Sequence, residues 1–327
     1  MNKVLKVLGA LLLAMAVVIA AGVIYFNSTF PKVDPPDNNI TIKATPARLE
    51  RGEYLANHVS ACIHCHSKRN WKYYSGPVVS GTEGMGGELF DPDLGIYAKN
   101  ITPATIGNYT DAELIRVIRT GVTNKGKALF PIMPYQLFAE MSREDLYSIV
   151  AYIKTLKPVP NEVPERHLGF PLNMIVKTMP KDLPINDEAP SPADTLAYGK
   201  YLTTIAGCID CHTPMEKGKF IEGMEYAGGM EFDLPGFGII RSVNITPDKQ
   251  TGIGDWNKEA FIERFKMYDS PQARTIKVGD GGMQTIMPWT DYAGMTEQDL
   301  GAIYTYLHSL KPIEHQVVRF VSATDVK

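Results

Sequence analysis

The sequence predicts an all-α fold in which two similar helical domains follow one membrane-spanning helix. Three observations support this prediction: an uncharged apolar run near the N-terminus, a repeat covering most of the remaining chain, and apolar residues at helical spacing near the end of each copy. A chain of 327 residues suits two domains, each able to build a core. The chain has 44% hydrophobic and 21% charged residues, close to globular averages. Its formal net charge is −3, and it has no block of basic residues that would indicate nucleic-acid binding.

The first element is the run from Val7 to Phe26, which contains no charge and no proline. At a rise of about 1.5 Å per residue its helix would be about 30 Å long, enough to cross a bilayer. A cleaved signal peptide is the alternative, but the run continues past the small residues where cleavage would fall. Because Lys3 and Lys6 precede the run, the positive-inside rule places everything after it outside the cytoplasm.

The chain beyond a short proline-containing spacer repeats itself with a period of about 145 residues, which indicates two copies of one domain rather than a solenoid. The matched segments are Gly52–Leu55 with Gly199–Leu202, Gly86–Phe90 with Gly228–Phe232, Asn100–Pro103 with Asn244–Pro247, and Ile132–Tyr135 with Ile286–Trp289. Between the copies lies a strap with eight prolines, whose apolar stretch from Leu172 to Met179 is expected to lie across a domain surface.

These boundaries divide the chain into six segments. They are a membrane anchor at 1–28, a spacer at 29–45, a first domain at 46–158, a proline-rich linker at 159–192, a second domain at 193–313 and a tail at 314–327.

Each copy is predicted to contain three principal helices. The leading helices cover 46–58 and 193–205, the middle helices 110–119 and 257–266, and the terminal helices 142–157 and 296–311. Each terminal helix opens on Ser or Thr with an acidic residue three positions later, a variant of the capping box. Apolar residues then recur at helical spacing, and we expect Pro158 and Pro312 to end the two helices.

Each copy carries one Cys-x-x-Cys-His pentad, at 62–66 and at 208–212, and together the pentads use all four cysteines. This spacing is typical of c-type haem attachment, with two thiols for the vinyl groups and a histidine for the iron. A lone pentad is also compatible with half of a zinc site, and four cysteines with two disulfides, but neither explains a histidine after both pairs. The sequence therefore predicts two haem c groups, held by Cys62, Cys65, Cys208 and Cys211.

The iron of each haem needs two axial ligands. His66 and His212 are predicted as the proximal ligands because they adjoin the thioether cysteines. Met133 and Met287 are predicted as the distal ligands, since each lies in a matched Ile-Met-Pro-aromatic segment after its histidine. Histidine and methionine ligation is a pattern of electron-transfer haems and raises the potential.

Other candidates have weaker support. Met141 and Met295 are matched, but each precedes the cap of a terminal helix and is expected in the core. Met85 and Met230 do not occupy equivalent positions, and the histidines outside the pentads have no counterparts. His64 stands where the second pentad has an aspartate, so we expect its side chain to be exposed.

Four loop residues are candidate contacts for the haem propionates. Asn100 and Asn244 match in the Asn-Ile-Thr-Pro loops, and Tyr109 and Trp256 match in front of the middle helices. Turn formation is an equally direct explanation for the asparagines, because Asn and Thr-Pro favour turns.

With these motifs the chain resembles the membrane-anchored bacterial cytochromes c, and is similar to the cytochrome c subunits of membrane-bound alcohol and gluconate dehydrogenases. The resemblance runs from Arg48 to Pro312 and includes both pentads and both Met-Pro-aromatic motifs. It implies two tandem class I cytochrome c domains that relay electrons between a periplasmic or membrane dehydrogenase, or a quinol donor, and a terminal oxidase or other respiratory acceptor. The chain differs from those subunits in having two pentads instead of three and an N-terminal anchor.

The predicted function is electron transfer by a protein with no substrate of its own, anchored by a single pass in the bacterial inner membrane with its body in the periplasm. Two alternatives remain: a dihaem peroxidase-like or thiosulfate-oxidising enzyme, and a subunit that tethers a dehydrogenase to the membrane. A peroxidase needs one haem that can lose its distal ligand, whereas the two copies keep equal methionine motifs. A thiosulfate enzyme of this type would use a further cysteine, and the chain has four.

Overall fold

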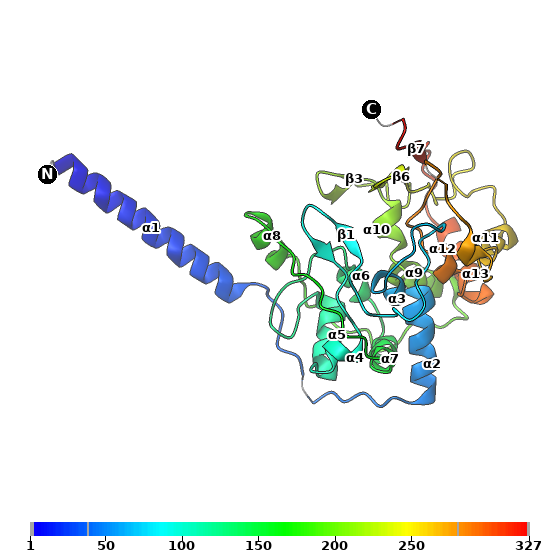
Figure 1. The fold of residues 1–327 in the computed structure, drawn as a ribbon, viewed down its shortest axis with the longest axis horizontal. Coiled ribbons are helices and arrows are strands. Elements are labelled where there is room, and N and C mark those ends of the chain that lie inside the picture. Colours follow the sequence, from blue (N-terminus) through cyan, green and yellow to red (C-terminus); the bar gives the residue numbers. More distant parts are fainter. Residues whose placement is uncertain (1–2, 38, 280, 326–327) are drawn as a thin grey trace.

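A computed structural model describes residues 3–37, 39–279 and 281–325 of the chain. Helix α1 (Lys3–Thr29) extends away from the remaining helices and buries none of its residues (Figure 1). Within the described residues it is the one helix that is long and apolar enough to cross a membrane. This agrees with the predicted anchor.

We call residues 46–158 the first repeat. Its elements are α2 (Pro46–Tyr54), the π-helical turn η1 (Leu55–Val59), α3 (Cys62–Cys65), β1 (Leu89–Asp91), β2 (Ile96–Tyr97), α4 (Pro103–Ile106), α5 (Asp111–Thr120), α6 (Tyr135–Phe138) and α7 (Arg143–Ile153).

We call residues 193–313 the second repeat. Its elements are α9 (Thr195–Ile205), α10 (Cys208–His212), β3 (Met215–Glu216), β4 (Lys219–Phe220), β5 (Glu231–Leu234), β6 (Gly238–Arg241), α11 (Lys258–Lys266), the 3-10 turn η2 (Ala273–Thr275), α12 (Trp289–Tyr292) and α13 (Glu297–His308). Helix α8 (Leu172–Thr178) lies in the linker, and β7 (Phe320–Ser322) in the tail pairs antiparallel with β6.

All six predicted helices are present, and side-chain caps explain where they begin. Thr110 and Glu113 form a reciprocal capping box at α5, and Ser142 and Thr296 accept hydrogen bonds from the third residues of α7 and α13. The terminal helices end at Ile153, five positions before Pro158, and at His308, four positions before Pro312, so neither reaches the proline expected to end it. Tighter turns close both helices first, because donors there bond three residues back.

Two expectations need correction. The fold is mainly helical, but it is not purely α, because it also contains two antiparallel strand pairs, β1–β2 and β3–β4, and one three-stranded antiparallel sheet, β5–β6–β7. The linker, for which no sustained helical pattern was expected, contains the two-turn helix α8, which buries only Val176. Two turns are too short to give a clear apolar period in the sequence.

A glycine lets the first and last helices of each repeat touch backbone to backbone. A Cβ on Gly52 of α2 would lie 1.9 Å from the carbonyl oxygen of Ser148 on α7. A Cβ on Gly199 of α9 would lie 2.0 Å from the carbonyl oxygen of Ala302 on α13. The same close crossing therefore forms the framework of both repeats, which explains why both keep glycine in the leading helix.

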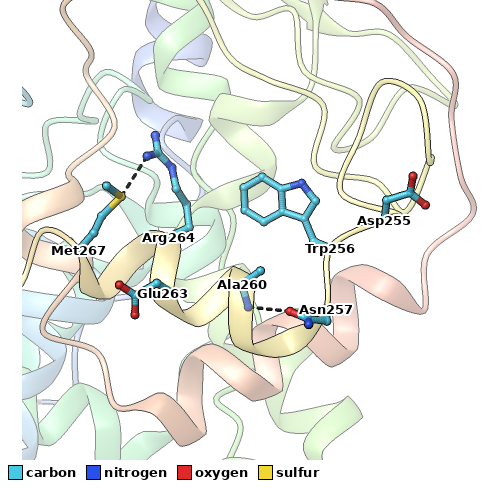
Figure 2. Close-up of a pocket in the computed structure, with 7 residues that line it drawn as sticks. All are labelled: Asp255, Trp256, Asn257, Ala260, Glu263, Arg264 and Met267. Atoms are coloured by element: carbon cyan, nitrogen blue, oxygen red, sulfur yellow. Dashed lines mark hydrogen bonds between the residues drawn. The ribbon is translucent and has the colours of Figure 1, made fainter.

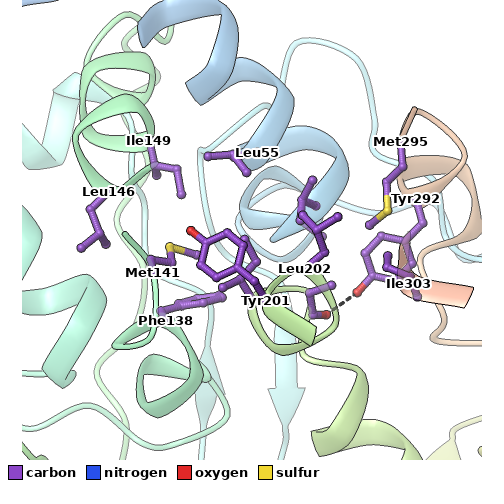
Figure 3. Close-up of a cluster of buried hydrophobic side chains, with 14 of the residues drawn as sticks. Leu55, Phe138, Met141, Leu146, Ile149, Tyr201, Leu202, Tyr292, Met295 and Ile303 are labelled. Carbon is purple, nitrogen blue, oxygen red and sulfur yellow. Dashed lines mark hydrogen bonds between the residues drawn. The ribbon is translucent and has the colours of Figure 1, made fainter. Parts of the chain in front are cut away.

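The buried apolar side chains of the two repeats form one continuous cluster instead of two separate cores (Figure 3). Leu55 and Ile149 contribute from the first repeat, and Leu202 and Ile303 from the second. All four are at most 3% exposed. The repeats are thus packed face to face, and the pentads, which follow the leading helices, are carried to this common interface.

Two matched tyrosines exchange hydrogen bonds across the interface. Tyr54 of the first repeat donates to Asp299 Oδ2 of the second at 2.6 Å, and Tyr201 of the second donates to Asp145 Oδ2 of the first at 2.7 Å. Each tyrosine oxygen also accepts the N–H of the opposite helix cap, Thr296 or Ser142. This reciprocal pattern relates the two repeats by an approximate twofold rotation.

One difference lies just before the pentads. Cys62 lies ten positions after Gly52, but Cys208 lies nine positions after Gly199. The extra residue is accommodated by the π-helical turn η1, since a π-bulge is how a helix absorbs one inserted residue. Within this turn His58 Nδ1 lies 2.8 Å from the carbonyl oxygen of Asp291, another contact across the interface.

Candidate functional site

The two pentads form matching short helices. Each begins after a residue in the left-handed region, Ala61 with φ 49° before α3 and Gly207 with φ 70° before α10. This turn ends the leading helix and places the two cysteines of each pentad three positions apart on one helical turn. None of the four cysteines is paired in a disulfide. Burial raises the pKa of the Cys62 and Cys208 thiols to about 12, so both are protonated near neutral pH.

The pentad histidines are oriented in the same way. His66 Nδ1 lies 2.6 Å from the carbonyl oxygen of Lys99, and His212 Nδ1 lies 2.8 Å from that of Val243. A carbonyl oxygen only accepts, so each Nδ1 carries the proton and each Nε2 keeps its lone pair. Burial also lowers the pKa of both histidines, which keeps the rings neutral. A neutral imidazole with Nδ1 fixed by a carbonyl is the form that ligates iron, so the residues fit a haem.

Asn100 and Asn244 hold the loops that supply these carbonyls. The Asn100 Oδ1 atom accepts from the N–H and hydroxyl of Thr102 at 2.9 and 2.8 Å, and its Nδ2 donates to Val159. Asn244 makes the equivalent bonds to Thr246 and donates to Ile313. Because both side chains are buried and engaged within the chain, turn formation accounts for their match. Propionate contact by them stays a prediction.

Tyr109 and Trp256, the other matched pair, have different surroundings. Tyr109 packs against the shared apolar cluster. Trp256 is 38% exposed and lines a surface hollow beside α11 with Arg264 and Met267 (Figure 2). The match in sequence therefore does not place both rings in equivalent positions.

The predicted distal methionines occupy equivalent places. Met133 and Met287 each precede a proline that caps a one-turn helix, α6 or α12, and each is half-buried against the shared cluster. The same cluster contacts Cys62 and Cys208. Met141 and Met295 are 0% and 2% exposed inside the cluster, which confirms them as core residues.

The expectation that His64 is exposed is wrong: the side chain is 2% exposed. Its Nδ1 lies 2.8 Å from Asp291 Oδ2 in the second repeat, and Arg69 donates to its Nε2 at 3.0 Å. Since Arg69 can only donate, His64 is neutral and donates from Nδ1 to Asp291. The absence of a matching histidine in the second pentad reflects this one-sided contact across the interface and not solvent exposure.

The structure brings the two pentads close to each other. The pKa of Cys211 is raised to about 12 chiefly by burial, and further by Asp210 and by Cys65 of the other pentad. Burial raises the pKa of Tyr292, and the nearby Cys208, Cys211 and Cys65 raise it further. Its hydroxyl donates to the carbonyl oxygen of Ala206 at 2.7 Å. Both attachment sites therefore adjoin one buried tyrosine, which no sequence pattern indicated.

The described part of the chain contains no group of three or more His, Cys, Asp and Glu side chains placed to hold a metal ion by themselves. The neighbouring pentads therefore do not combine into a zinc site in the arrangement described. The arrangement of each pentad, with two thiols before a neutral and oriented imidazole, suits attachment of a porphyrin.

Comparison with known proteins identifies the class. Residues 196–311 match the family model "Cytochrome c". This part of the chain, with the pentad at 208–212 and Met287, is therefore a cytochrome c domain, a class that carries covalently bound haem c and transfers electrons.

The chain as a whole is similar to cytochrome c subunits of dehydrogenases, as expected. It is 31% identical over 290 residues to the cytochrome c subunit of an alcohol dehydrogenase (quinone) of Gluconacetobacter polyoxogenes, covering 84% of this chain and 58% of the relative. It is 28% identical over 285 residues to the gluconate 2-dehydrogenase cytochrome c subunit of Pantoea cypripedii, covering 82% of this chain and 60% of the relative. The chain thus spans a little over half the length of these subunits.

A third relative has the same length scale as this chain. The "Diheme cytochrome c-type" protein of Cereibacter sphaeroides is 26% identical over 314 residues, which cover 92% of this chain and 97% of the relative.

Proposed function

We propose that this protein transfers electrons through two covalently bound haems, one in each repeat. The observation that carries the proposal is the repetition of one constellation: two thiols on a helical turn, a neutral histidine with Nδ1 on a carbonyl, and a methionine after about seventy residues. A haem bound in this way supplies a one-electron redox couple. The protein's part is to fix the imidazole, hold the thioether and exclude water.

The proposed ligands are His66 with Met133 in the first repeat and His212 with Met287 in the second. Buried imidazoles held by backbone carbonyls present Nε2 without further rearrangement. The half-buried methionines border the shared apolar cluster, a low-dielectric setting that favours the less charged, reduced iron. Six-coordinate sites of this kind have no open position for substrate, which favours a carrier over an enzyme.

The neighbouring pentads support transfer between the haems inside the chain. Support comes from Cys65 of the first repeat and from Cys208 and Cys211 of the second, because all three lie near the buried Tyr292 at the interface between the repeats. We propose that an electron enters at one repeat, crosses this interface and leaves from the other.

We propose that α1 anchors the protein in the bacterial inner membrane with both repeats in the periplasm. The two lysines before the apolar run support this orientation. The relatives named as dehydrogenase subunits support a dehydrogenase as electron donor, with a quinol as an alternative donor and a terminal oxidase or another respiratory component as acceptor.

The first experiment is a haem count on the purified holoprotein. The pyridine haemochrome assay and the intact mass should give two haems per chain, and Cys62→Ser with Cys65→Ser should remove one. One haem in the unmodified protein would contradict the proposal. A high-spin oxidised spectrum with turnover of peroxide would favour the peroxidase-like alternative, and turnover of thiosulfate would favour the thiosulfate-oxidising one.

A second experiment tests the anchor. A variant expressed with a cleavable export signal in place of residues 1–29 should keep its haem spectrum and appear in the soluble periplasmic fraction, while the full chain stays in the membrane fraction. Recovery of the full chain in the soluble fraction would contradict the proposed anchor.

A further inference from the structure

The loop that follows the first pentad contains an unusual serine. Ser75 is fully buried and has a φ of +68°, a conformation that costs energy for a residue with a Cβ. Such a residue persists only where its surroundings fix it. The surroundings of Ser75 belong to the second repeat.

The Ser75 side chain bonds to both sides of Pro288 in the distal methionine loop. Its hydroxyl donates to the carbonyl oxygen of Met287 at 2.6 Å and accepts the N–H of Trp289 at 3.0 Å. One hydroxyl thus spans the Met-Pro-Trp segment and uses its donor and an acceptor site. The backbone of Met287, the proposed iron ligand, is therefore held by a side chain of the other repeat.

Gln284 completes the attachment and leaves none of its polar atoms unpaired. Its Oε1 accepts the N–H of Ser75 at 2.8 Å and that of Thr285 at 2.9 Å. Its Nε2 donates to the carbonyl oxygens of Trp71 and Tyr73 at 3.0 and 2.9 Å. The side chain is fully buried. A buried and fully satisfied network of this kind is rigid, because any movement leaves a polar group unpaired.

The backbone extends the same contact. The N–H of Tyr74 donates to the carbonyl oxygen of Ile276 at 2.7 Å, and that of Val278 donates to Lys72 at 3.2 Å. The longer loop after α11 therefore turns toward the first repeat. In the first repeat the shorter loop after α5 folds back on its own helix, where Arg116 donates to the carbonyl oxygen of Thr123.

The equivalent loop of the first repeat has no such support. The turn itself is the same, since the N–H of Tyr135 donates to Met133 at 2.8 Å and that of Trp289 to Met287 at 2.8 Å. Among the described residues, no side chain of the second repeat hydrogen-bonds to residues 131–135. The buried hydroxyl of Tyr135 has no hydrogen-bond partner in the described structure.

We propose that Ser75 is a positioning residue for Met287, so that a loop of the first repeat holds the distal ligand of the second haem. This inference rests on the proposed function. A thioether is a weak, neutral ligand that stays on iron only while its loop holds it in place. The hydroxyl of Ser75 fixes that loop at the residues on either side of Pro288, and no described residue gives the Met133 loop a counterpart to this support.

The test uses Ser75→Ala in the full-length holoprotein. Losing a buried hydroxyl that serves two backbone groups should make added imidazole displace the methionine of the second haem with about tenfold higher affinity. The red absorption band of methionine-ligated ferric haem should therefore fall by half at about one tenth of the imidazole concentration that the unmodified protein needs. The reduction potential of the second haem should also drop. The first haem should be unchanged, with each haem assigned by its own Met→His variant.

Two further variants separate this role from a general loss of stability. Ser75→Gly removes the hydroxyl but relieves the positive φ, so it should loosen the methionine as Ser75→Ala does while folding more stably. Ser148→Ala removes another buried serine hydroxyl, on α7 and 3% exposed, and should leave imidazole affinity at both haems unchanged.

Each outcome decides between the hypotheses. Loosening at the second haem alone, in both Ser75 variants, supports the positioning role. Unchanged imidazole affinity, or an equal change at both haems, overturns it. If the unmodified protein lacks the methionine band at the second haem, the ligand assignment in the proposed function fails. If the band is present and resists added imidazole in Ser75→Ala as strongly as in the unmodified protein, only the positioning role fails.

Discussion

The two interfaces between a pentad and the opposite methionine loop are related by the repeat, but among the described residues a hydrogen bond closes only one of them. His64 and Asp210 hold the third position of their pentads, and Asp291 and Leu137 each follow the matched methionine by four residues. His64 donates to Asp291 at 2.8 Å in a buried contact.

At the other interface Asp210 lines a pocket with Leu137 and Met133. Its carboxylate has no hydrogen-bond partner in the part of the chain that the structure describes. Burial raises its pKa to about 6. The comparison indicates that the two repeats share their internal frame and the reciprocal tyrosine bonds, while the contacts around the pentads and methionine loops differ. The second methionine loop is held by the first repeat, and the first methionine loop lies beside a pocket.

The shared frame should respond equally to matched changes. Gly52→Ala and Gly199→Ala force a Cβ to within 1.9 and 2.0 Å of a carbonyl oxygen, so each should lower the free energy of unfolding by roughly 3 kcal/mol or more. Chemical denaturation of the holoprotein measures this. Gly169→Ala, where nothing lies within 4 Å of the added Cβ, is the control and should be nearly neutral. If only one of the two variants lost much stability, the helix crossings of the two repeats would not be equivalent.

Replacing the aspartate at each of the two interfaces should change the free energy of unfolding differently. Asp291→Leu leaves the buried Nδ1–H of His64 without an acceptor and should destabilise the protein by about 2 kcal/mol. Asp210→Leu removes a carboxylate that has no partner beside an apolar pocket and should be neutral or stabilising. The same denaturation experiment compares them. Equal destabilisation by both variants would show that the asymmetry is absent in solution.

Removing the hydroxyls of the two reciprocal tyrosines should destabilise the protein by unequal amounts, with a smaller difference between the two variants than at the aspartates. Tyr54→Phe removes the hydroxyl that donates to Asp299 and should cost about 2 kcal/mol, because this is a bond to a buried charged group. Tyr201→Phe should cost about 1 kcal/mol, since Asp145 keeps its two bonds from Arg51 at 2.8 and 2.9 Å. Thermal unfolding of the two variants measures the order. A larger loss in Tyr201→Phe would contradict the role given to Arg51.

Local patterns explain what the sequence could predict. The pentads, the Met-Pro-aromatic segments and the capping residues act within a few positions of the chain, so their spacing is visible without a fold. The six principal helices follow from the same signals, with errors at the ends where capping turns precede the prolines. Both methionine pairs are matched between the copies, and the position of Met141 and Met295 just before a helix cap is the local signal that assigns them to the core.

Contacts between distant residues explain what it could not. Ser75 and Met287 are 212 positions apart, and His64 and Asp291 are 227 apart, and no periodicity links them. The mismatch between His64 and Asp210 was visible but was interpreted as exposure, since a comparison of copies reports difference and not burial. The carbonyls that orient His66 and His212 are backbone groups, which leave no mark on the residue type.

The central claim is that each repeat holds its own iron with its own methionine. Redox titration of the holoprotein, followed in the α-band, tests it with Met133→His and Met287→His. We expect two one-electron waves in the unmodified protein and a lowered potential for one wave only in each variant, a different wave in each case, because histidine in place of methionine lowers the potential. A single wave, no shift in either variant, or a shift of the same wave in both would contradict the account.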